Sequence, residues 1–262
     1  MNHITGLITT LNEENNIREC IDSLKLICEE IIVVDSNSTD RTVEIARECG
    51  AKTYLQSYLG DGIQKNVGLK YSNNLWVFSL DADERITPEL AEEINALNLE
   101  HTEYEAFAVK RKNFIGSRWV KCCHWYPNYL IRLYRHDKTC FADVKQHAWV
   151  PSSNYRKLNT AILHFTYKNT GEMFAKPGRN YSTRSAKILY LQGKKANALT
   201  PVLHGIGAFC KNYFLYGGIF GGIDGYSVSK SISINAYLKY AKLLEYQRDE
   251  KVRNAENFDE VW

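Results

Sequence analysis

Trp76-Val77-Phe78-Ser79-Leu80-Asp81-Ala82-Asp83-Glu84 is the stretch that decides the fold. Its apolar start is typical of a buried strand, and it ends abruptly in carboxylates. In a parallel sheet, functional groups lie just beyond the carboxyl ends of the strands. Alternate residues of an extended segment face the same way, so we expect Asp81 and Asp83 to converge while Ala82 leaves the backbone room. Such carboxylates can hold a divalent cation and the phosphates that it neutralises, although an acidic turn that caps the next helix would look the same.

Strand and helix patterns alternate four times over the first ninety residues. Short apolar strands are predicted at 4–10, 31–34 and 51–55, ahead of the strand that begins at Trp76. Between the first two, apolar residues recur at helical spacing from Ile17 to Ile27, and Asn12 is a candidate N-cap for that helix. This alternation predicts an α/β fold with an open, mostly parallel sheet and helices on both faces.

Polar side chains follow three of these strands at the same expected edge of the sheet. They are Thr9, Thr10 and Asn12 after the first strand, Asp35 after the second, and Asp81 and Asp83 after the fourth. A dinucleotide-binding dehydrogenase would need a glycine-rich turn after the first strand, where this chain has Thr-Thr-Leu-Asn-Glu, and no Walker lysine loop is present. We therefore expect carboxylates with a metal, rather than glycine amides, to bind phosphates.

Composition sets limits on the class of protein. The net charge of +3 in 262 residues gives no reason to expect nucleic-acid binding. Seven scattered cysteines without a Cys-x-x-Cys pair argue against a disulfide framework or a zinc site and favour a reducing cytoplasm. Met1-Asn2-His3 leads straight into a strand, so no signal peptide is expected. The apolar stretch from Leu199 to Ile223 is too polar for a confident membrane span.

Five motifs in order resemble those of glycosyltransferase family 2. They are Thr9-Thr10-Leu11-Asn12-Glu13-Glu14, Val33-Val34-Asp35-Ser36, Ser38-Thr39-Asp40, Gln64-Lys65-Asn66 and Leu80-Asp81-Ala82-Asp83-Glu84. The resemblance implies the GT-A fold, a nucleotide-sugar donor, a divalent metal (Mg²⁺ or Mn²⁺) and inversion at the anomeric carbon. Two later stretches, Trp125–Leu133 and Gly218–Gly225, resemble a narrower branch, the lipopolysaccharide inner-core glucosyltransferases that add β-linked glucose to heptose.

The resemblance assigns roles residue by residue. The residues placed at the donor site are Thr9, Thr10, Asn12, Glu13, Asp35, Gln64, Lys65, Asp81 and Ala82. Thr9 and Asp35 would contact the uridine, and Asp81 would lie near the ribose or the metal. Asp83 would be the direct metal ligand. Asp35 could instead cap the helix that follows it, and Lys65 could be an ordinary solvated lysine.

An inverting transfer also needs a general base for the acceptor hydroxyl. The related branch carries a Val-His-Glu motif here, whereas this chain has Asp143-Val144-Lys145-Gln146-His147-Ala148. If His147 matches the motif histidine, Ala148 stands where the acid belongs, and we expect low activity. An engineered inactive variant, a base displaced to Asp143, or a different local alignment all remain open.

The second half is expected to hold the acceptor side. The aromatic residues Trp125 and Tyr126 could stack on a sugar face or simply pack in their loop, and Arg132 belongs to the same motif. Helices are predicted at 171–192 and 231–246. Basic and aromatic residues mixed along this region suit an anionic lipid interface, although a solvated helical face is an equal explanation for any single residue.

These observations predict two domains: a GT-A nucleotide-sugar-binding and catalytic domain over residues 1–165, and a helical C-terminal extension over 166–262 that carries the acceptor side. The expected reaction is transfer of a hexose from a UDP-sugar, most simply UDP-glucose, to a lipid-linked heptose of the inner core. The enzyme would lie peripherally on the cytoplasmic face of the inner membrane. The alternatives are a catalytically impaired nucleotide-sugar-binding protein and a nucleotidyltransferase.

Overall fold

The structure is a computed structural model that describes residues 2–144, 148–176 and 181–255. It divides into two compact units. The first unit comprises Met1–Lys112 and Pro127–His164, and the second comprises Asn113–Tyr126 and Phe165–Trp262. The second unit thus takes up a short segment from within the first 165 residues. The sequence-based boundary at residue 165 stays a prediction.

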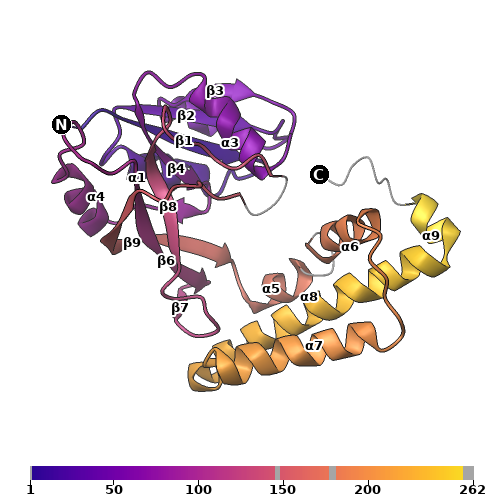
Figure 1. Ribbon diagram of the computed structural model, residues 1–262. Helices are drawn as coiled ribbons and strands as arrows, with labels where there is room; N and C mark the ends of the chain where they lie inside the picture. The colour runs from indigo at the N-terminus through magenta and orange to yellow at the C-terminus, as the bar shows by residue number, and fades with distance from the viewer. Residues whose placement is uncertain (1, 145–147, 177–180, 256–262) are drawn as a thin grey trace. The chain divides into compact units, whose positions relative to one another are not determined.

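Four parallel strands form the first part of the sheet in the first unit, in the order β3-β2-β1-β4 (Figure 1). These strands are β1 (Ile4–Thr10), β2 (Glu30–Asp35), β3 (Lys52–Leu55) and β4 (Trp76–Asp81). Thr10 lies opposite Asp35 on one neighbour, and Thr9 lies opposite Asp81 on the other. The three strands therefore end in register, which brings their polar residues to one edge of the sheet.

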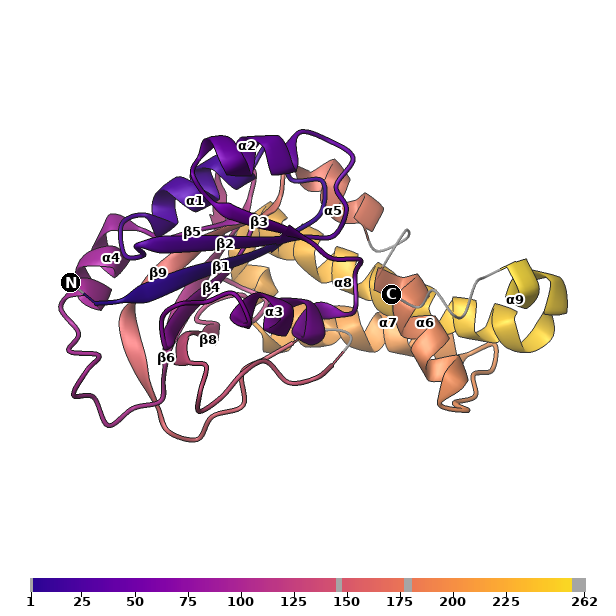
Figure 2. The ribbon, with the colours of Figure 1, turned by 90° about the horizontal axis from the view of Figure 1, so that it is seen from above.

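Helices cover both faces of this parallel sheet (Figure 2). On one face, α1 (Ile17–Leu24), α2 (Thr42–Glu48) and α4 (Pro88–Asn95) pack against alternate strand residues such as Ile8, Val33 and Phe78. On the other face, α3 (Asp61–Leu69) packs through Val67 on Leu7 and Val34. Because strand side chains alternate, each apolar strand supplies both cores. The α/β architecture expected from the sequence is confirmed.

Antiparallel strands continue the sheet beyond β4 in the order β8-β6-β9-β5. These strands are β5 (Glu84–Arg85), β6 (Ala106–Ile115), β8 (Tyr129–Arg135) and β9 (Tyr155–Tyr167). Strand β8 pairs with β4 on one side and with β6 on the other. Strand β9 was not among the expected elements, and it pairs with β5 so that His164 lies opposite Glu84.

The second unit is mostly helical. Its elements are β7 (Arg118–Val120), α5 (Thr170–Lys176), α6 (Ser182–Leu191), α7 (Thr200–Cys210), the π-helix η2 (Lys211–Leu215), the 3-10 helix η3 (Gly218–Gly221), α8 (Gly222–Arg248) and α9 (Glu250–Ala255). Its core includes Ile115, Val120, Met173 and Val228. The helix expected at 231–246 is part of the longer α8, which begins already at Gly222. Among the residues that the structure describes, no helix is long and apolar enough to cross a bilayer.

Candidate active site

Asp81, the last residue of β4, is held by two cations from different elements. Lys65 on α3 donates a hydrogen bond from Nζ to Asp81 Oδ1, and Arg132 on β8 donates one from Nη2 to Oδ2 at 2.9 Å. Burial alone would raise the pKa of Asp81, but the Lys65 ammonium and the Arg132 guanidinium hold it well below its usual range. Lys65 Nζ also lies 3.3 Å from Thr9 Oγ1. Asp81 is therefore a fixed carboxylate at the edge of the sheet.

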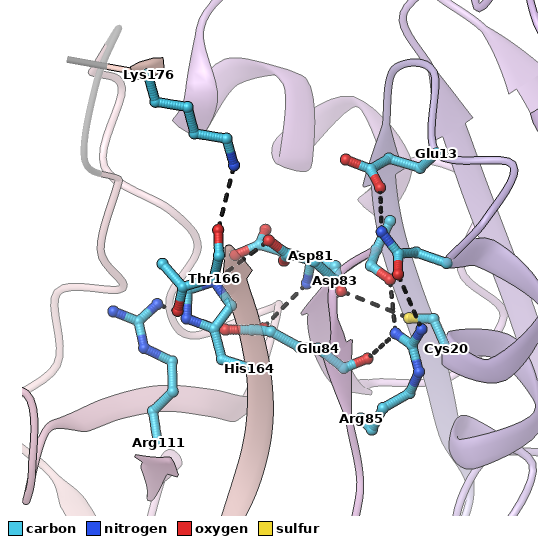
Figure 3. Close-up of polar contacts among 12 residues, drawn as sticks. Glu13, Cys20, Asp81, Asp83, Glu84, Arg85, Arg111, His164, Thr166 and Lys176 are labelled. Atoms are coloured by element: carbon cyan, nitrogen blue, oxygen red, sulfur yellow. Dashed lines mark hydrogen bonds and ion pairs between the residues drawn. The ribbon is translucent and has the colours of Figure 1, made fainter. Parts of the chain in front are cut away.

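Glu84 is fully buried and takes part in the same network of charges. Arg132 Nη2 lies 2.5 Å from Glu84 Oε2, and Arg111 Nη1 lies 3.5 Å from Oε1. The Asp81 backbone N–H donates to Glu84 Oε2 at 3.1 Å (Figure 3). The sequence left open that this acidic turn, from Glu84 to Glu89, caps the following helix. Thr87 does cap α4 by accepting from the Leu90 N–H at 3.2 Å, whereas Glu84 supports the backbone beneath Asp81.

Asp83 faces a histidine that the sequence analysis did not select. His164 Nε2, on β9, lies 3.3 Å from Asp83 Oδ2 (Figure 3). Both side chains are partly accessible, at 13% exposure for His164 and 26% for Asp83. Carboxylate oxygen suits Mg²⁺ and Mn²⁺, and imidazole nitrogen is a common ligand of divalent transition metals. Because β9 pairs with β5, the fold brings this histidine next to the Asp-x-Asp motif from a distant part of the sequence.

Asp83 and His164 fit a divalent cation whose remaining ligands are oxygens of the substrate. Within the described part of the chain, no group of three or more His, Cys, Asp or Glu side chains could hold a metal alone. Mg²⁺-type cations in phosphate-transferring sites are commonly held by one or two carboxylates plus substrate phosphates and water. The donor set of Asp83 and His164 matches that kind of open site, whereas both oxygens of Asp81 already accept from cations.

Asp35 and Asn12 organise the turns beside this edge. The buried Asp35 carboxylate accepts from the Ser38 N–H at 2.7 Å and from the Ser38 hydroxyl at 2.5 Å. Asn12 does not cap the first helix, which begins at Ile17; it has a φ of 56°. Its Oδ1 accepts from the Thr39 N–H at 2.8 Å. The turn after β1 and the turn after β2 are therefore joined by a hydrogen bond from the Thr39 N–H to the Asn12 side chain. Asn and Asp side chains readily accept hydrogen bonds from nearby backbone N–H groups.

The other expected donor-site residues lie around the same turns. Gln64 on α3 is buried, and its Nε2 donates to Ser36 Oγ at 3.1 Å and to the Gln56 carbonyl at 3.0 Å. Glu13 Oε2 accepts from Asn16 Nδ2 at 2.6 Å. The Thr10 hydroxyl is buried and has no hydrogen-bond partner among the described residues, and Ala82 is buried.

The residues proposed for proton removal lie on the segment after β8. Asp143 is exposed, and Ala148 is half-buried with its methyl group against the apolar cluster that includes Val34 and Phe141. His147 lies outside the described residues. The segment is anchored on α3, because the Gly62 N–H donates to the Val144 carbonyl at 3.1 Å.

Trp125 and Tyr126 belong to the second unit and contact aromatic neighbours within it. The Tyr126 ring meets Trp119 edge to face with centroids 5.1 Å apart, and the Trp125 ring lies 6.3 Å from Tyr167. The Trp125 carbonyl accepts from Asn113 Nδ2 at 2.9 Å. Arg132, the third residue expected on the acceptor side, is instead buried between Asp81 and Glu84 in the first unit.

Three residues of this site were not selected from the sequence: His164, Arg111 and Glu84 in its buried role. Arg111 and Arg132 lie on neighbouring antiparallel strands, and their charges compensate Glu84. A run of β-branched and aromatic residues at 155–167 was the available signal for β9. No sequence signal predicted that His164 contacts Asp83, because this contact depends on the pairing of β9 with β5.

A family model and a curated relative together identify the family of this chain. A family model described as Glycosyl transferase family 2 matches residues 6–148. An uncharacterized glycosyltransferase of Rickettsia felis is 32% identical over 257 residues, covering 94% of this chain and 90% of that protein. The lipopolysaccharide core biosynthesis glycosyltransferase LpsC of Rhizobium meliloti is 28% identical and covers 94% of this chain and 92% of that protein. A solved structure of S. aureus TarS 1–349 in complex with UDP aligns with a TM-score of 0.49 at 17% identity, over 95% of this chain and 92% of that chain.

Proposed function

The chain belongs to glycosyl transferase family 2, and we propose that it transfers glucose from UDP-glucose to a heptose of a lipopolysaccharide inner core. The observation that supports a role in lipopolysaccharide core synthesis is the similarity to LpsC, which extends along nearly the whole of both chains. Glucose and heptose are proposed from the resemblance of Trp125–Leu133 and Gly218–Gly225 to the inner-core glucosyltransferases. Membership of the family replaces the nucleotidyltransferase alternative.

The donor would bind at the edge where β1, β2 and β4 end. In this proposal Thr9 and Asp35 contact the uridine, with Thr10, Asn12, Glu13, Gln64 and Ala82 shaping the surrounding turns. Asp81 accepts from the ribose hydroxyls, and Lys65 and Arg132 hold its carboxylate in one orientation. Arg132 is thus a positioning residue and not an acceptor contact.

Asp83 and His164 would hold a divalent cation, Mg²⁺ or Mn²⁺, beside the diphosphate. When bound, such a cation neutralises the negative charge that develops on the departing nucleoside diphosphate. Carboxylate oxygen suits both metals, and the imidazole adds a preference for Mn²⁺.

An acidic residue must remove the acceptor hydroxyl proton as the glucosyl bond forms. Asp143 is the exposed carboxylate on the segment anchored at Gly62, and it takes this role in our proposal. Ala148 occupies the position of the missing glutamate, and we expect a low rate as a result. The acceptor sugar would stack on Trp125 and Tyr126.

The acceptor is lipid-linked in this proposal, so the enzyme would work peripherally on the cytoplasmic face of the inner membrane. The decisive experiment incubates purified protein with radiolabelled UDP-glucose, other UDP-sugars, and a heptose-terminated lipopolysaccharide core. We expect labelled core that depends on Mg²⁺ or Mn²⁺ and is lost with a chelator.

Two outcomes would contradict the proposal. Transfer from a different UDP-sugar would rule out UDP-glucose as the donor. Transfer only to an acceptor without heptose would rule out heptose as the acceptor. Tight, metal-dependent binding of UDP-glucose with neither transfer nor hydrolysis would favour the alternative of a nucleotide-sugar-binding protein with impaired catalysis.

A further inference from the structure

Large apolar side chains stand exposed along α7 and the turn that follows it. The most exposed are Phe220, at 91%, and Leu215, at 78%. We call the following set the apolar ridge: Leu199, Leu203, Ile206, Phe214, Leu215 and Phe220. Leu199, Leu203 and Ile206 are spaced four and three residues apart and so share one face of the helix. Soluble monomers seldom leave a large apolar face exposed unless a partner or membrane covers it.

The side of α7 that faces α8 carries small or polar residues instead. The buried positions of α7 and η2 are Pro201, Gly205 and Asn212. A Cβ placed on Gly205 would lie 3.2 Å from Tyr237 Cβ, and Ser233 Oγ donates to the Gly205 carbonyl at 2.8 Å. Figures 1 and 2 both show α7 running beside α8.

This distribution is the reverse of that in a helix on the surface of a water-soluble protein. Such a helix buries its large apolar side chains and exposes polar ones. Helices that pack in lipid bring small residues together and turn large apolar residues outward. The packing between α7 and α8 is therefore already complete, and the apolar ridge is left for another surface.

The charges around the ridge favour an anionic surface. Between Gly193 and Lys230 the basic residues are Lys194, Lys195, Lys211 and Lys230. The only acidic residue in that stretch is Asp224, and Arg118 neutralises it at 3.0 Å. Two copies of this chain packed ridge to ridge would bring the lysines together, whereas acidic headgroups would compensate them.

We infer that the apolar ridge inserts into the boundary between headgroups and acyl chains in one leaflet of an anionic bilayer. The helix α7, with 11 residues, is roughly 17 Å long, which is well short of the ~30 Å hydrocarbon core. It can lie in the interface without spanning the membrane. The inference builds on the membrane location in the proposed function and adds the surface, the mode of contact and the lipid charge.

The first test is flotation of the purified full-length protein with vesicles of phosphatidylcholine, with or without phosphatidylglycerol. We expect binding to the mixed vesicles, weaker binding to phosphatidylcholine alone, and about a tenfold loss for each of L203S and F220S, because each removes one inserted apolar side chain. The matched control is L55S, which removes a leucine that is 61% exposed on the first unit. Equal binding by wild type, ridge variants and control would overturn the inference.

The second test uses two native cysteines in the unmodified fold. Cys210 ends α7 and Cys140 lies in the first unit, and both are exposed. An environment-sensitive fluorophore on Cys210 in C140S should shift to the blue with mixed vesicles, whereas the same label on Cys140 in C210S should not. No shift at Cys210, or equal shifts at both sites, would contradict insertion of the ridge.

A second copy of the chain is the competing occupant, and sedimentation velocity identifies it. Dimers that L203S converts to monomers, together with unchanged vesicle binding, would overturn the inference in favour of self-association. None of these measurements depends on sugar transfer. A protein that binds vesicles through the ridge but transfers no glucose would therefore contradict only the proposed function.

Discussion

Asp81 and Asp83 lie two residues apart in different electrostatic surroundings. Both oxygens of Asp81 accept from cationic donors, Lys65 and Arg132, so a metal there would have to displace an ion pair. Among the residues that the structure describes, Asp83 forms an ion-pair contact with His164 alone, whose imidazole is charged only when protonated. The metal role therefore belongs to Asp83 in our proposal, and Asp81 is a positioned acceptor for ribose.

We expect D83N to lower metal-dependent transfer by at least about 100-fold, because an amide oxygen binds a hard cation far more weakly than a carboxylate. H164A should raise the Mn²⁺ concentration needed for half-maximal activity by about 10- to 100-fold. Both are measured by titrating Mn²⁺ into a transfer assay. The matched control is D137N, since Asp137 pairs with Arg135 on the surface, away from the donor edge. Unchanged metal dependence in D83N would remove Asp83 from the site.

The lowered pKa of Asp81 predicts how stability depends on pH. Because the pKa is lower in the folded state than the value of about 3.9 in the unfolded chain, the stabilisation is complete above the unfolded value. It is lost as the pH falls from about 5 through the folded value. Urea unfolding of wild type and D81N should therefore show the largest difference near pH 7 and a shrinking difference towards pH 3. A difference that grows on acidification would contradict the sign of the shift.

Ala148 offers a gain-of-function test. If it occupies the base position, A148E should raise the transfer rate by about 10²- to 10⁴-fold, which is the usual contribution of a general base. A148Q has nearly the same shape and cannot take the proton, so it should give no gain. Both variants must be compared by thermal melting, because the Ala148 methyl group packs against an apolar cluster. No gain with a folded A148E would leave Asp143 as the candidate base.

At the scale of elements, the parallel half of the sheet followed from sequence, and the antiparallel half followed only in part, because β9 was not expected. Strands β1 to β4 are short apolar runs separated by helical periodicity, and local pattern is sufficient for such units. Strand β9 starts with three consecutive exposed residues and pairs with the two-residue β5. Its place depends on long-range pairing, which local pattern does not encode, and for that reason His164 was missed.

Asp35 shows what sequence predicts at the donor site: the place of a residue in the fold, but not its hydrogen bonds. Its position at a strand end predicted that it would lie near Asp81, and the register of β1 with β2 and β4 brings the two strand ends together. Its hydrogen bonds to Ser38 lie within its own turn and do not cap α2, which begins at Thr42 with Arg41 at the N-cap position. A carboxylate fixed by its own turn is presented to a ligand in one orientation.

Helix packing in the second unit can be tested with two glycines. A Cβ on Gly225 of α8 would lie 1.9 Å from the Gly218 carbonyl oxygen, whereas one on Gly207 of α7 meets nothing within 4 Å. G225A should therefore destabilise by about 1–3 kcal/mol or more, and G207A should stabilise by about 0.5–1 kcal/mol through helix propensity. Thermal and urea unfolding measure both. Similar effects of the two substitutions would mean that the turn at Gly218 is not closely packed.

At the scale of the whole molecule, a segment that interrupts the first unit in sequence belongs to the second unit. The hairpin at 113–126 leaves the first unit and returns, and it contributes Ile115, Val120 and Cys123 to a core shared with Met173 and Val228. Where the hairpin leaves, the Arg111 N–H donates to the Asn128 carbonyl at 2.9 Å. The two ends of the excursion are therefore already adjacent in the first unit.

This arrangement predicts that a simple truncation after residue 165 fails. Such a fragment keeps the hairpin but loses Met173 and Val228, so apolar side chains that are buried in the full chain would face water and the fragment should aggregate. Replacing residues 113–126 by Asn-Gly, a sequence that favours a two-residue hairpin turn, should restore a soluble fragment. Gel filtration and circular dichroism would compare the two fragments at equal concentration.

Donor binding gives the fragment comparison a functional measure. If the first unit holds the whole donor site, the hairpin-deleted fragment should be stabilised by UDP with Mn²⁺ by roughly 2.7 kcal/mol when UDP is at 100 times its dissociation constant, and the same fragment carrying D83N should not be. A soluble simple truncation that binds UDP equally well would instead support the sequence-based boundary at residue 165. It would also show that the hairpin does not need the helices to be stable.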